Sequence, residues 1–167
     1  MKHLVLIGMM GSGKTTVGRA LAERLKLPVL DTDTAIEQMQ GLSVAEIFKL
    51  SGEKQFRKLE AMLVERLKGM PTHIVSSGGG IILNGANTLT LKEIGVVIYL
   101  KASLQTLEKN LSGEEDSRPL LINHSLEALI KVRSPLYEGA AHGIIEIDGK
   151  TVEEIVHEIF ALYTGIC

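Results

Sequence analysis

Residues 8–15 read Gly8-Met9-Met10-Gly11-Ser12-Gly13-Lys14-Thr15 and match the phosphate-binding pattern G-x-x-x-x-G-K-[ST] at every fixed position. The apolar run at residues 4–7 before them is typical of a buried parallel strand, and residues 16–26 after them carry apolar side chains at helical spacing. Strand, glycine loop and helix thus follow in the order that lets backbone N–H groups and a helix N-terminus hold a phosphate. The pattern predicts that the chain binds a nucleoside triphosphate.

Within this loop, Lys14 is expected to reach the β- and γ-phosphate oxygens, and the Thr15 hydroxyl is expected to hold Mg²⁺. Further contacts to ATP are expected from four neighbours in the loop and the first helical turn: Gly11, Ser12, Gly13 and Thr16. A glycine turn that matches the pattern by chance is the alternative. The flanking strand and helix argue against that alternative.

Composition sets the class of protein. The chain has 167 residues, of which 45% are hydrophobic and 23% charged, as expected for a single globular domain with a sizeable core. A net charge of −2 gives no electrostatic basis for binding nucleic acid. Cys167 is the only cysteine, which excludes an intrachain disulfide and a cysteine metal cluster. Because the first strand begins within three residues and no apolar run approaches about 18 residues, we expect no signal peptide, no membrane segment and a cytoplasmic enzyme.

Strands and helices are expected to alternate along the chain, which is typical of an α/β fold whose parallel sheet has helices on both faces. Two helices carry the spacing of a capping box at their start, Ser43 with Glu46 and Thr151 with Glu154. Gly52 is expected to end the first of these helices. The predicted strands span residues 4–7, 29–30, 74–76, 96–100 and 144–147.

Asp31-Thr32-Asp33 follows the second predicted strand directly. The period of two in strand geometry sends both carboxylates to the same side and the intervening Thr32 to the other. Ligands of open α/β sheets bind at the carboxyl ends of the strands, so one acid is expected to serve Mg²⁺ and the other the acceptor. The alternative is structural, with Asp33 as the N-cap of the helix that follows.

Three further groups have both a structural and a functional interpretation. Arg57 and Glu60, one helical turn apart, form an exposed ion pair by default. Gly78-Gly79-Gly80 allows close approach of a ligand, or a flexible turn. The polar segment at residues 112–117 leads to Arg118, which either neutralises charge on a transferring phosphoryl group from a closing lid or is simply solvated.

Taken in order, these stretches resemble the shikimate kinase family along essentially the whole chain. The resemblance implies ATP-dependent phosphorylation of the 3-hydroxyl of shikimate, on the pathway to chorismate and the aromatic amino acids. The matching signatures are residues 8–18, Asp31-Thr32-Asp33, Phe56-Arg57-Lys58-Leu59-Glu60, Gly78-Gly79-Gly80, Ser117-Arg118-Pro119-Leu120-Leu121 and Arg133-Ser134-Pro135-Leu136-Tyr137.

The resemblance also implies the nucleoside-monophosphate-kinase-like P-loop fold, with a five-stranded parallel sheet flanked by helices. Residues 1–167 would form a single P-loop kinase domain. Its substrate-binding segment would lie at about residues 33–60 and its lid at about residues 111–124. We expect a monomer whose partners are ATP and shikimate, with no role for nucleic acid or a membrane.

By the same resemblance, Asp33 would bind the ring hydroxyls and Arg57 and Arg133 would bind the carboxylate. Gly79 and Gly80 would contribute backbone N–H groups. These roles suit the chemistry, because arginine forks match a planar carboxylate and a carboxylate accepts from vicinal hydroxyls.

The remaining roles concern the phosphates and the base. Asp31 would bind Mg²⁺ through water, in addition to Thr15. The catalytic residues would be Lys14, Asp33 and Arg118, of which Lys14 and Arg118 would also contact ATP. Glu60 would orient Arg57. The family usually places an arginine against the adenine, where this chain has Lys109.

Two other classes share parts of this pattern. A gluconate kinase or a nucleoside monophosphate kinase would also have the P-loop and lid, but Arg57, Arg133 and the paired aspartates suit a hydroxylated carboxylate better. A GTP-dependent switch is disfavoured because the sequence has no N-K-x-D signature and no D-x-x-G after the loop.

Overall fold

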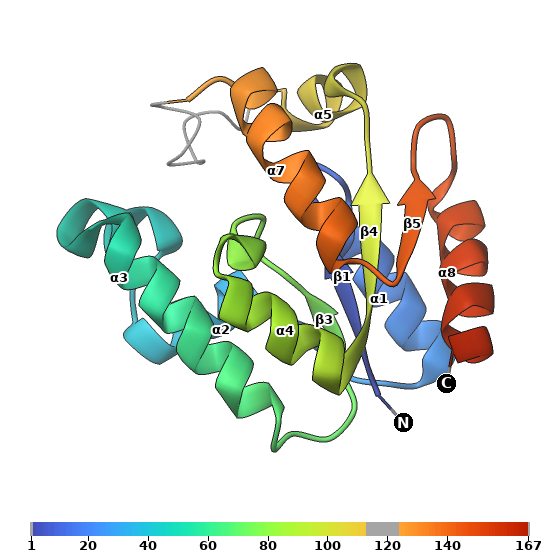
Figure 1. Ribbon diagram of the computed structural model, residues 1–167, viewed down its shortest axis with the longest axis horizontal. Coiled ribbons are helices and arrows are strands. Elements are labelled where there is room, and N and C mark those ends of the chain that lie inside the picture. The colour runs from blue at the N-terminus through green and yellow to red at the C-terminus, as the bar shows by residue number, and fades with distance from the viewer. Residues whose placement is uncertain (1, 113–123, 167) are drawn as a thin grey trace.

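The computed structural model describes residues 2–112 and 124–166. Five strands form one sheet in the order β2-β3-β1-β4-β5, and every neighbouring pair is parallel (Figure 1). Each strand expected from the sequence is present, with ends that differ by at most one residue. The strands are β1 (His3–Ile7), β2 (Val29–Asp31), β3 (Ile74–Ser76), β4 (Gly95–Lys101) and β5 (Gly143–Glu146).

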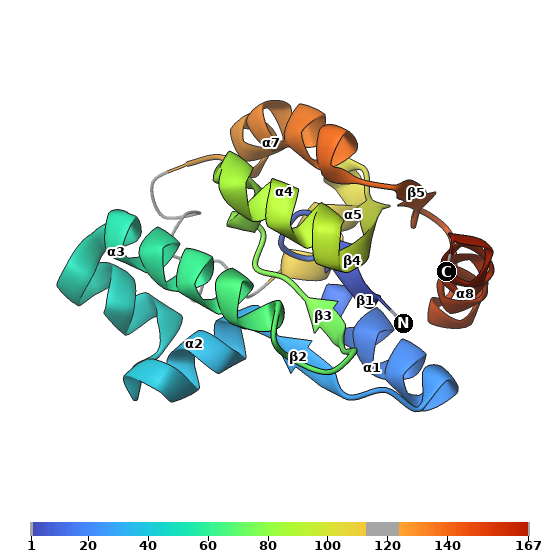
Figure 2. The same ribbon diagram turned by 60° about the horizontal axis from the view of Figure 1, so that its bottom comes forward.

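Helices cover both faces of the sheet. Helices α1 and α8 lie on one face, and α4, α7 and the C-terminal part of α3 lie on the other (Figure 2). No helix in the described ranges is long and apolar enough to cross a membrane. The helices are α1 (Lys14–Leu25), α2 (Thr32–Gln40), α3 (Val44–Leu67), the 3₁₀ turn η1 (Ile81–Leu83), α4 (Gly85–Ile94), α5 (Leu104–Leu111), α7 (Leu126–Ala140) and α8 (Val152–Ile166).

The central strand β1 has a continuous apolar sequence instead of alternating polar and apolar residues, and its burial explains why. All five of its residues are buried. Leu4 and Leu6 join the core beneath α1 and α8, whereas Val5 and Ile7 join the core beneath α3, α4 and α7. Both faces therefore require apolar side chains, as in other sheets covered on two sides.

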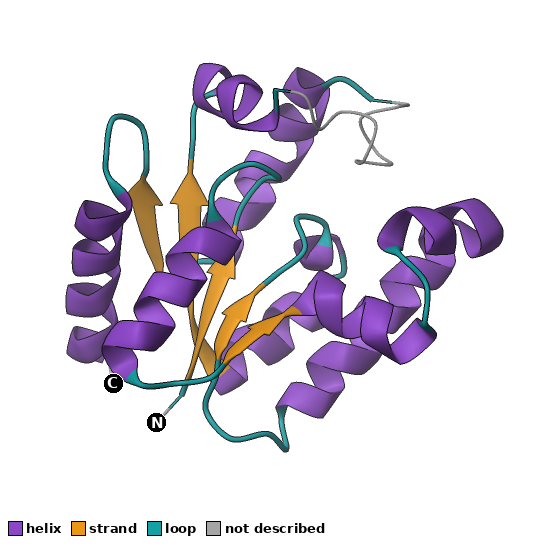
Figure 3. Ribbon diagram, turned by 180° about the vertical axis from the view of Figure 1, so that it is seen from behind, coloured by secondary structure: helices purple, strands orange, loops and turns teal. Residues whose placement is uncertain are grey.

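Helix α2 and the first half of α3 form a smaller unit that projects beyond the sheet (Figure 3). It has its own apolar cluster, which includes Ile36, Phe56 and Leu63. The predicted break is present at Gly52, whose φ of 79° and ψ of 170° interrupt α3 without ending it. This unit leads into the turn of α3 that carries Arg57. The Arg57 guanidinium lies against Gly80, which follows β3.

Both predicted capping boxes are confirmed. The Ser43 hydroxyl accepts from Glu46 N at 3.2 Å while the Glu46 carboxylate accepts from Ser43 N at 2.7 Å. Thr151 and Glu154 repeat this exchange at 3.2 and 2.7 Å, where α8 begins. Each box satisfies backbone donors that the first turn of a helix leaves without partners.

Candidate active site

The phosphate loop between β1 and α1 depends on glycine conformations. Gly8, Gly11 and Gly13 have φ values of 150°, 81° and 85°. A Cβ on Gly8 would also lie 2.7 Å from Leu100 O, so an alanine there would meet both strain and a backbone atom. The loop closes on itself through Ser12 N, which donates to Met9 O at 3.1 Å. Only glycines permit this turn at the carboxyl end of β1.

Lys14 is folded over the loop. Its Nζ donates to Gly8 O and Met9 O, both at 2.8 Å, and the side chain is buried. These carbonyls hold the ammonium group at the rim of the cradle that the loop forms. A phosphate, which is a charged acceptor, makes stronger hydrogen bonds to an ammonium group than neutral carbonyls do.

A cluster of oxygen atoms lies beside Lys14, at the ends of β2 and β3. Thr15 Oγ1 donates to Asp31 Oδ2 at 3.0 Å and lies 3.4 Å from Ser76 Oγ. Oxygen ligands are those that Mg²⁺ prefers, so the donor set fits this ion. The described residues include no group of three or more His, Cys, Asp or Glu side chains suited to hold a metal. An ion at Thr15 and Asp31 would therefore take further ligands from water and phosphate.

The geometric argument for the two aspartates is wrong, although both reach the site. Strand β2 ends at Asp31, and helix α2 begins at Thr32, so the strand period does not apply across these residues. Asp31, not Asp33, is the N-cap, because its Oδ1 accepts from Asp33 N and Thr34 N at 3.1 Å each. Asp33 lies in the first turn of α2.

A cavity of about 780 Å³ runs along this edge of the sheet. It is lined by the phosphate loop, the ends of β2 and β3, and residues of α5 and α8. Arg57, Gly80 and Arg133 do not line this cavity, but they lie beside its Gly78–Gly79 wall. The predicted site residues that do line it are Gly11, Ser12, Gly13, Lys14, Thr15, Thr16, Asp31, Asp33, Gly79 and Lys109.

The glycine run at residues 78–80 is the point at which the predicted acceptor residues meet. A Cβ on Gly78 would lie 2.5 Å from Asp33 Oδ1, and one on Gly79 would lie 3.4 Å from Arg133 Nη1. A Cβ on Gly80 would overlap the guanidinium of Arg57. A methyl group at Gly78 or Gly80 would displace the Asp33 carboxylate or the Arg57 guanidinium, whereas one at Gly79 would meet only ordinary contact distances. This favours the close-approach interpretation at Gly78 and Gly80.

Gly80→Ala tests this packing. Gly80 has φ −98° and ψ 2°, which alanine adopts without strain, so the new methyl group should act only by displacing Arg57. We expect the KM for the acceptor to rise about tenfold, as for loss of one good arginine contact, with the KM for ATP unchanged. Gly85→Ala is the matched control, since a Cβ there meets nothing within 4 Å. Equal kinetics in the two variants would refute the role of this contact.

The Arg57–Glu60 pair is not the exposed surface pair that spacing alone predicts. Arg57 Nη1 donates to Glu60 Oε2 at 2.7 Å, and the Glu60 side chain is only 1% exposed. Burial disfavours the charged guanidinium, but the charges of Glu60 and Glu53 outweigh this effect and raise the pKa of Arg57. Glu60 thus holds Arg57 in place, as predicted. Arg133, on α7, is also buried.

Burial raises the pKa of Glu60 from 4.5 to about 7, against the opposing charge of Arg57, while the Asp33 carboxylate adds to the increase and Arg133 opposes it. Between pH 4.5 and 7 the folded protein therefore binds more protons at this site than the unfolded chain does. Stability then falls as the pH rises. We expect the free energy of unfolding of the wild type, relative to that of Glu60→Gln, to decrease from pH 5 to pH 8 in urea titrations. A difference that stays constant or grows would mean that Glu60 is ionised throughout.

Tyr137 is a site residue that the sequence argument missed, although it ends one of the matching signatures. Its hydroxyl donates to Gly79 O, and its ring stacks on Tyr99 with centroids 5.0 Å apart. Burial raises the pKa of Tyr137 to about 12, so the hydroxyl keeps its proton. Tyr137 thereby fixes the carbonyl orientation of the glycine turn.

At the other end of the cavity lie residues of α5 and of the β5–α8 connection, where a base would lie. Lys109 is exposed there, beside Asn110. Asn110 Nδ2 donates to Gly11 O at 2.9 Å, a contact that the sequence argument missed and that ties α5 to the phosphate loop. The apolar floor at this end is formed by Ile147, Val152 and Ile155.

Arg118 and most of the expected lid, residues 113–123, lie outside the described residues. Leu111 is the last residue of α5, and His124 and Ser125 lead into α7, which begins at Leu126. The predicted roles of Arg118 and the lid stay predictions.

Comparisons of both sequence and structure match this chain to shikimate kinases. The family model described as shikimate kinase matches residues 10–164. A shikimate kinase of Caldanaerobacter subterraneus subsp. tengcongensis is 41% identical over 167 residues, covering 98% of this chain and 96% of its own. One of Pelotomaculum thermopropionicum is 42% identical over 165 residues, covering 94% and 95%. The structure of shikimate kinase from Acinetobacter baumannii in complex with shikimate has a TM-score of 0.92 at 33% identity, covering 99% of this chain and 94% of that chain.

Proposed function

Because the chain belongs to the shikimate kinase family, we propose that it transfers the γ-phosphoryl group of ATP to the 3-hydroxyl of shikimate, giving 3-phosphoshikimate and ADP. This reaction lies on the pathway to chorismate and the aromatic amino acids. One observation carries the proposal beyond family membership: Asp33, Arg57 and Arg133 meet around a glycine turn that also forms a wall of the phosphate cavity. The two arginines can donate to a carboxylate and Asp33 can accept from hydroxyl groups, which suits a hydroxylated carboxylic acid.

The acceptor would be held at the glycine turn. Arg57 and Arg133 supply the guanidinium groups for its carboxylate, and Asp33 accepts hydrogen bonds from its ring hydroxyls. Gly79 and Gly80 would add backbone N–H groups, neither of which donates to an acceptor among the described residues. In this arrangement residues 33–60 form the substrate-binding segment of a single kinase domain.

The nucleotide would lie along the cavity. The loop residues Gly11, Ser12 and Gly13 would bind its phosphates through backbone N–H groups, with Thr16 at the first turn of α1. Thr15 and Asp31 would hold Mg²⁺, directly and through water. The ion, when bound, supplies positive charge to the phosphate oxygens.

Transfer of a phosphoryl group through a loose transition state requires alignment and charge neutralisation more than covalent chemistry. Lys14 would leave the carbonyls of Gly8 and Met9 for the phosphate oxygens as the charge shifts. Asp33 would orient the 3-hydroxyl and accept its proton, orientation being the larger part of its role. Arg118 would add a further positive charge, and Lys109 would lie near the adenine.

A coupled assay of ADP release tests the function against its alternatives. Shikimate, gluconate, CMP and no acceptor are compared at equal concentration with ATP and Mg²⁺. Release that depends on shikimate is expected, whereas preference for gluconate or CMP would assign a related kinase and equal release without acceptor would indicate an ATPase.

We further propose that the enzyme is a monomer and acts in the cytoplasm, where ATP is available. Light scattering would check the oligomeric state, and cell fractionation would check the location.

A further inference from the structure

Arg57 shares its single charge between two glutamates of its own helix. Nη1 donates to Glu60 Oε2 at 2.7 Å, and Nη2 donates to Glu53 Oε1 at 3.1 Å. Its third donor, Nε, is buried and has no hydrogen-bond partner among the residues that the structure describes. The proposed receptor for the substrate carboxylate is thus already engaged by carboxylates within the protein.

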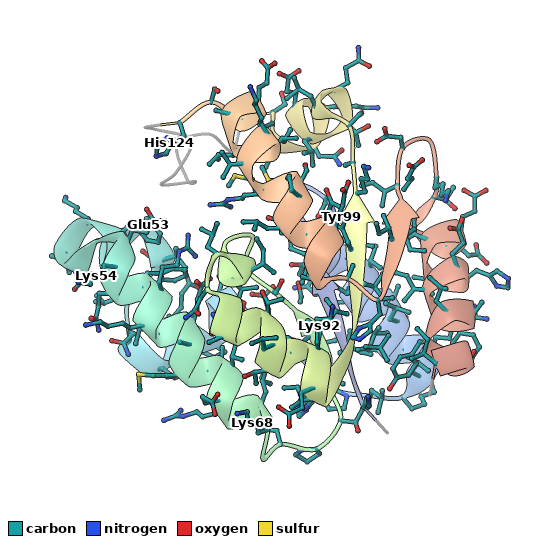
Figure 4. All side chains as sticks on the ribbon, viewed as in Figure 1. Glu53, Lys54, Lys68, Lys92, Tyr99 and His124 are labelled. Atoms are coloured by element: carbon teal, nitrogen blue, oxygen red, sulfur yellow. The ribbon has the colours of Figure 1, made fainter. Side chains whose placement is uncertain are left out.

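The two glutamates differ sharply in exposure. The Glu60 side chain is 1% exposed, whereas that of Glu53 is 47% exposed. Glu53 lies on the outer half of α3, which projects from the sheet (Figure 4). A buried ion pair is costly to break, while an exposed pair contributes little. Glu60 is therefore the permanent partner of Arg57, and Glu53 is the exchangeable one.

The geometry of the Arg57 guanidinium indicates how many hydrogen bonds a substrate carboxylate could form if it replaced Glu53. Nη2 and Nε share one edge of the planar group, and a carboxylate placed on that edge accepts from both. Glu53 accepts only from Nη2, which leaves Nε without an acceptor. A carboxylate that replaced Glu53 and reached Nε as well as Nη2 would form two hydrogen bonds to Arg57 where Glu53 forms one.

The negative charge of Glu53 also favours its displacement by a substrate carboxylate. Glu53 and Glu60 both pair with Arg57 before any substrate is present, and Asp33 and Arg133 lie near Glu60. An arriving carboxylate adds another negative charge, so the presence of Glu53 opposes its binding.

From this geometry we propose that Glu53 competes with the substrate carboxylate for Arg57 and is displaced by it, so that Glu53 lowers the affinity for the acceptor. The inference rests on the proposed function. It differs from the role of Glu60, which positions Arg57, because removal of a competitor strengthens binding whereas removal of a positioning residue weakens it.

The test is Glu53→Gln, which keeps the size of the side chain and removes its charge. We expect the Kd for shikimate from calorimetry, and its KM, to fall about two- to fivefold, the range set by an exposed ion pair. The kcat should stay unchanged, and the melting temperature should fall by no more than the loss of one exposed ion pair allows. The methyl ester of shikimate, which brings no charge to Arg57, should bind both proteins alike.

Glu65→Gln is the matched control. Glu65 forms an exposed pair with Lys68 at 2.9 Å on the same helix, and Figure 4 shows Lys68 at the opposite end of α3 from Glu53. This variant should leave the affinity for shikimate unchanged.

Weaker or unaltered shikimate binding in Glu53→Gln would overturn the competition, as would equal tightening for the acid and its ester. The wild type tests the proposed function separately. If the wild type neither binds nor phosphorylates shikimate, the proposed function fails and this inference with it, whereas normal wild-type turnover with an unaltered variant removes only the role of Glu53.

Discussion

Lys14→Ala is expected to lower kcat by about 10³-fold, with shikimate binding retained. The ammonium group lies 2.8 Å from Gly8 O and from Met9 O in the phosphate loop. The loop pattern predicts that it binds the β- and γ-phosphate oxygens of ATP. Charge that develops on the transferring group is stabilised by such a preorganised cation more than the ground state is, so the loss falls on the chemical step. Single-turnover kinetics with saturating ATP would measure it.

Lys68→Ala controls for loss of a lysine charge, because Lys68 forms an exposed pair with Glu65 at the far end of α3, away from the phosphate loop. It should keep wild-type kinetics. If Lys14→Ala instead raised the KM for ATP and kept kcat, Lys14 would serve ground-state binding and the transition state would be stabilised by other groups.

The second large effect is expected at the acceptor. Asp33→Asn keeps the size of the side chain but removes a charged hydrogen-bond acceptor, worth about 1.5 to 3 kcal/mol. The kcat/KM for shikimate should fall about 10- to 100-fold. Fluorescent-nucleotide titration should show that ATP binding persists, because Asp33 lies at the glycine turn rather than in the phosphate loop.

Glu37→Gln is the matched control on the same helix. Its carboxylate accepts from Val44 N at 2.8 Å, a bond within the α2–α3 unit that glutamine can replace. This variant should keep kcat/KM near the wild-type value. Near-normal turnover of shikimate by Asp33→Asn would remove Asp33 from the acceptor site.

The parts of the fold that sequence predicts are those fixed by local pattern. The central strand β1 is an apolar run because both of its faces are covered, and the phosphate loop has glycines where positive φ is required. Ser43 and Thr151 mark helix starts because capping bonds span only three residues. Each of these signals is complete within a few positions of the chain.

The error at Asp31-Thr32-Asp33 has a physical reason. Strand geometry predicts that Asp31 and Asp33 point the same way, but the chain turns into α2 directly after Asp31. Asp31 caps that helix with one oxygen and accepts from the Thr15 hydroxyl with the other, so the residue predicted to serve Mg²⁺ also has the structural role. The sequence pattern suggests the N-cap for Asp33 and the resemblance gives the Mg²⁺ to Asp31, whereas in the structure Asp31 is the N-cap as well as the neighbour of Thr15.

Contacts between residues far apart in the sequence could not be predicted from local patterns. Tyr137 bonds to Gly79, 58 residues away, and Asn110 bonds to Gly11, 99 residues away. The burial of Glu60 likewise depends on how α3 packs, since its spacing from Arg57 is the same as in an exposed pair. Resemblance to the family predicted which residues bind ATP and the acceptor, but it did not predict these supporting contacts.

The product itself is the most direct test of the proposed reaction. Shikimate, ATP, Mg²⁺ and the wild-type enzyme are incubated, and the product is examined by phosphorus–proton correlation NMR. A phosphorus signal coupled to the proton on C3 of the ring, formed in amount equal to the ADP released, is the expected result. Phosphorus attached at another hydroxyl, or ADP formed without any phosphorylated shikimate, would contradict the placement of the 3-hydroxyl between Asp33 and the phosphate loop.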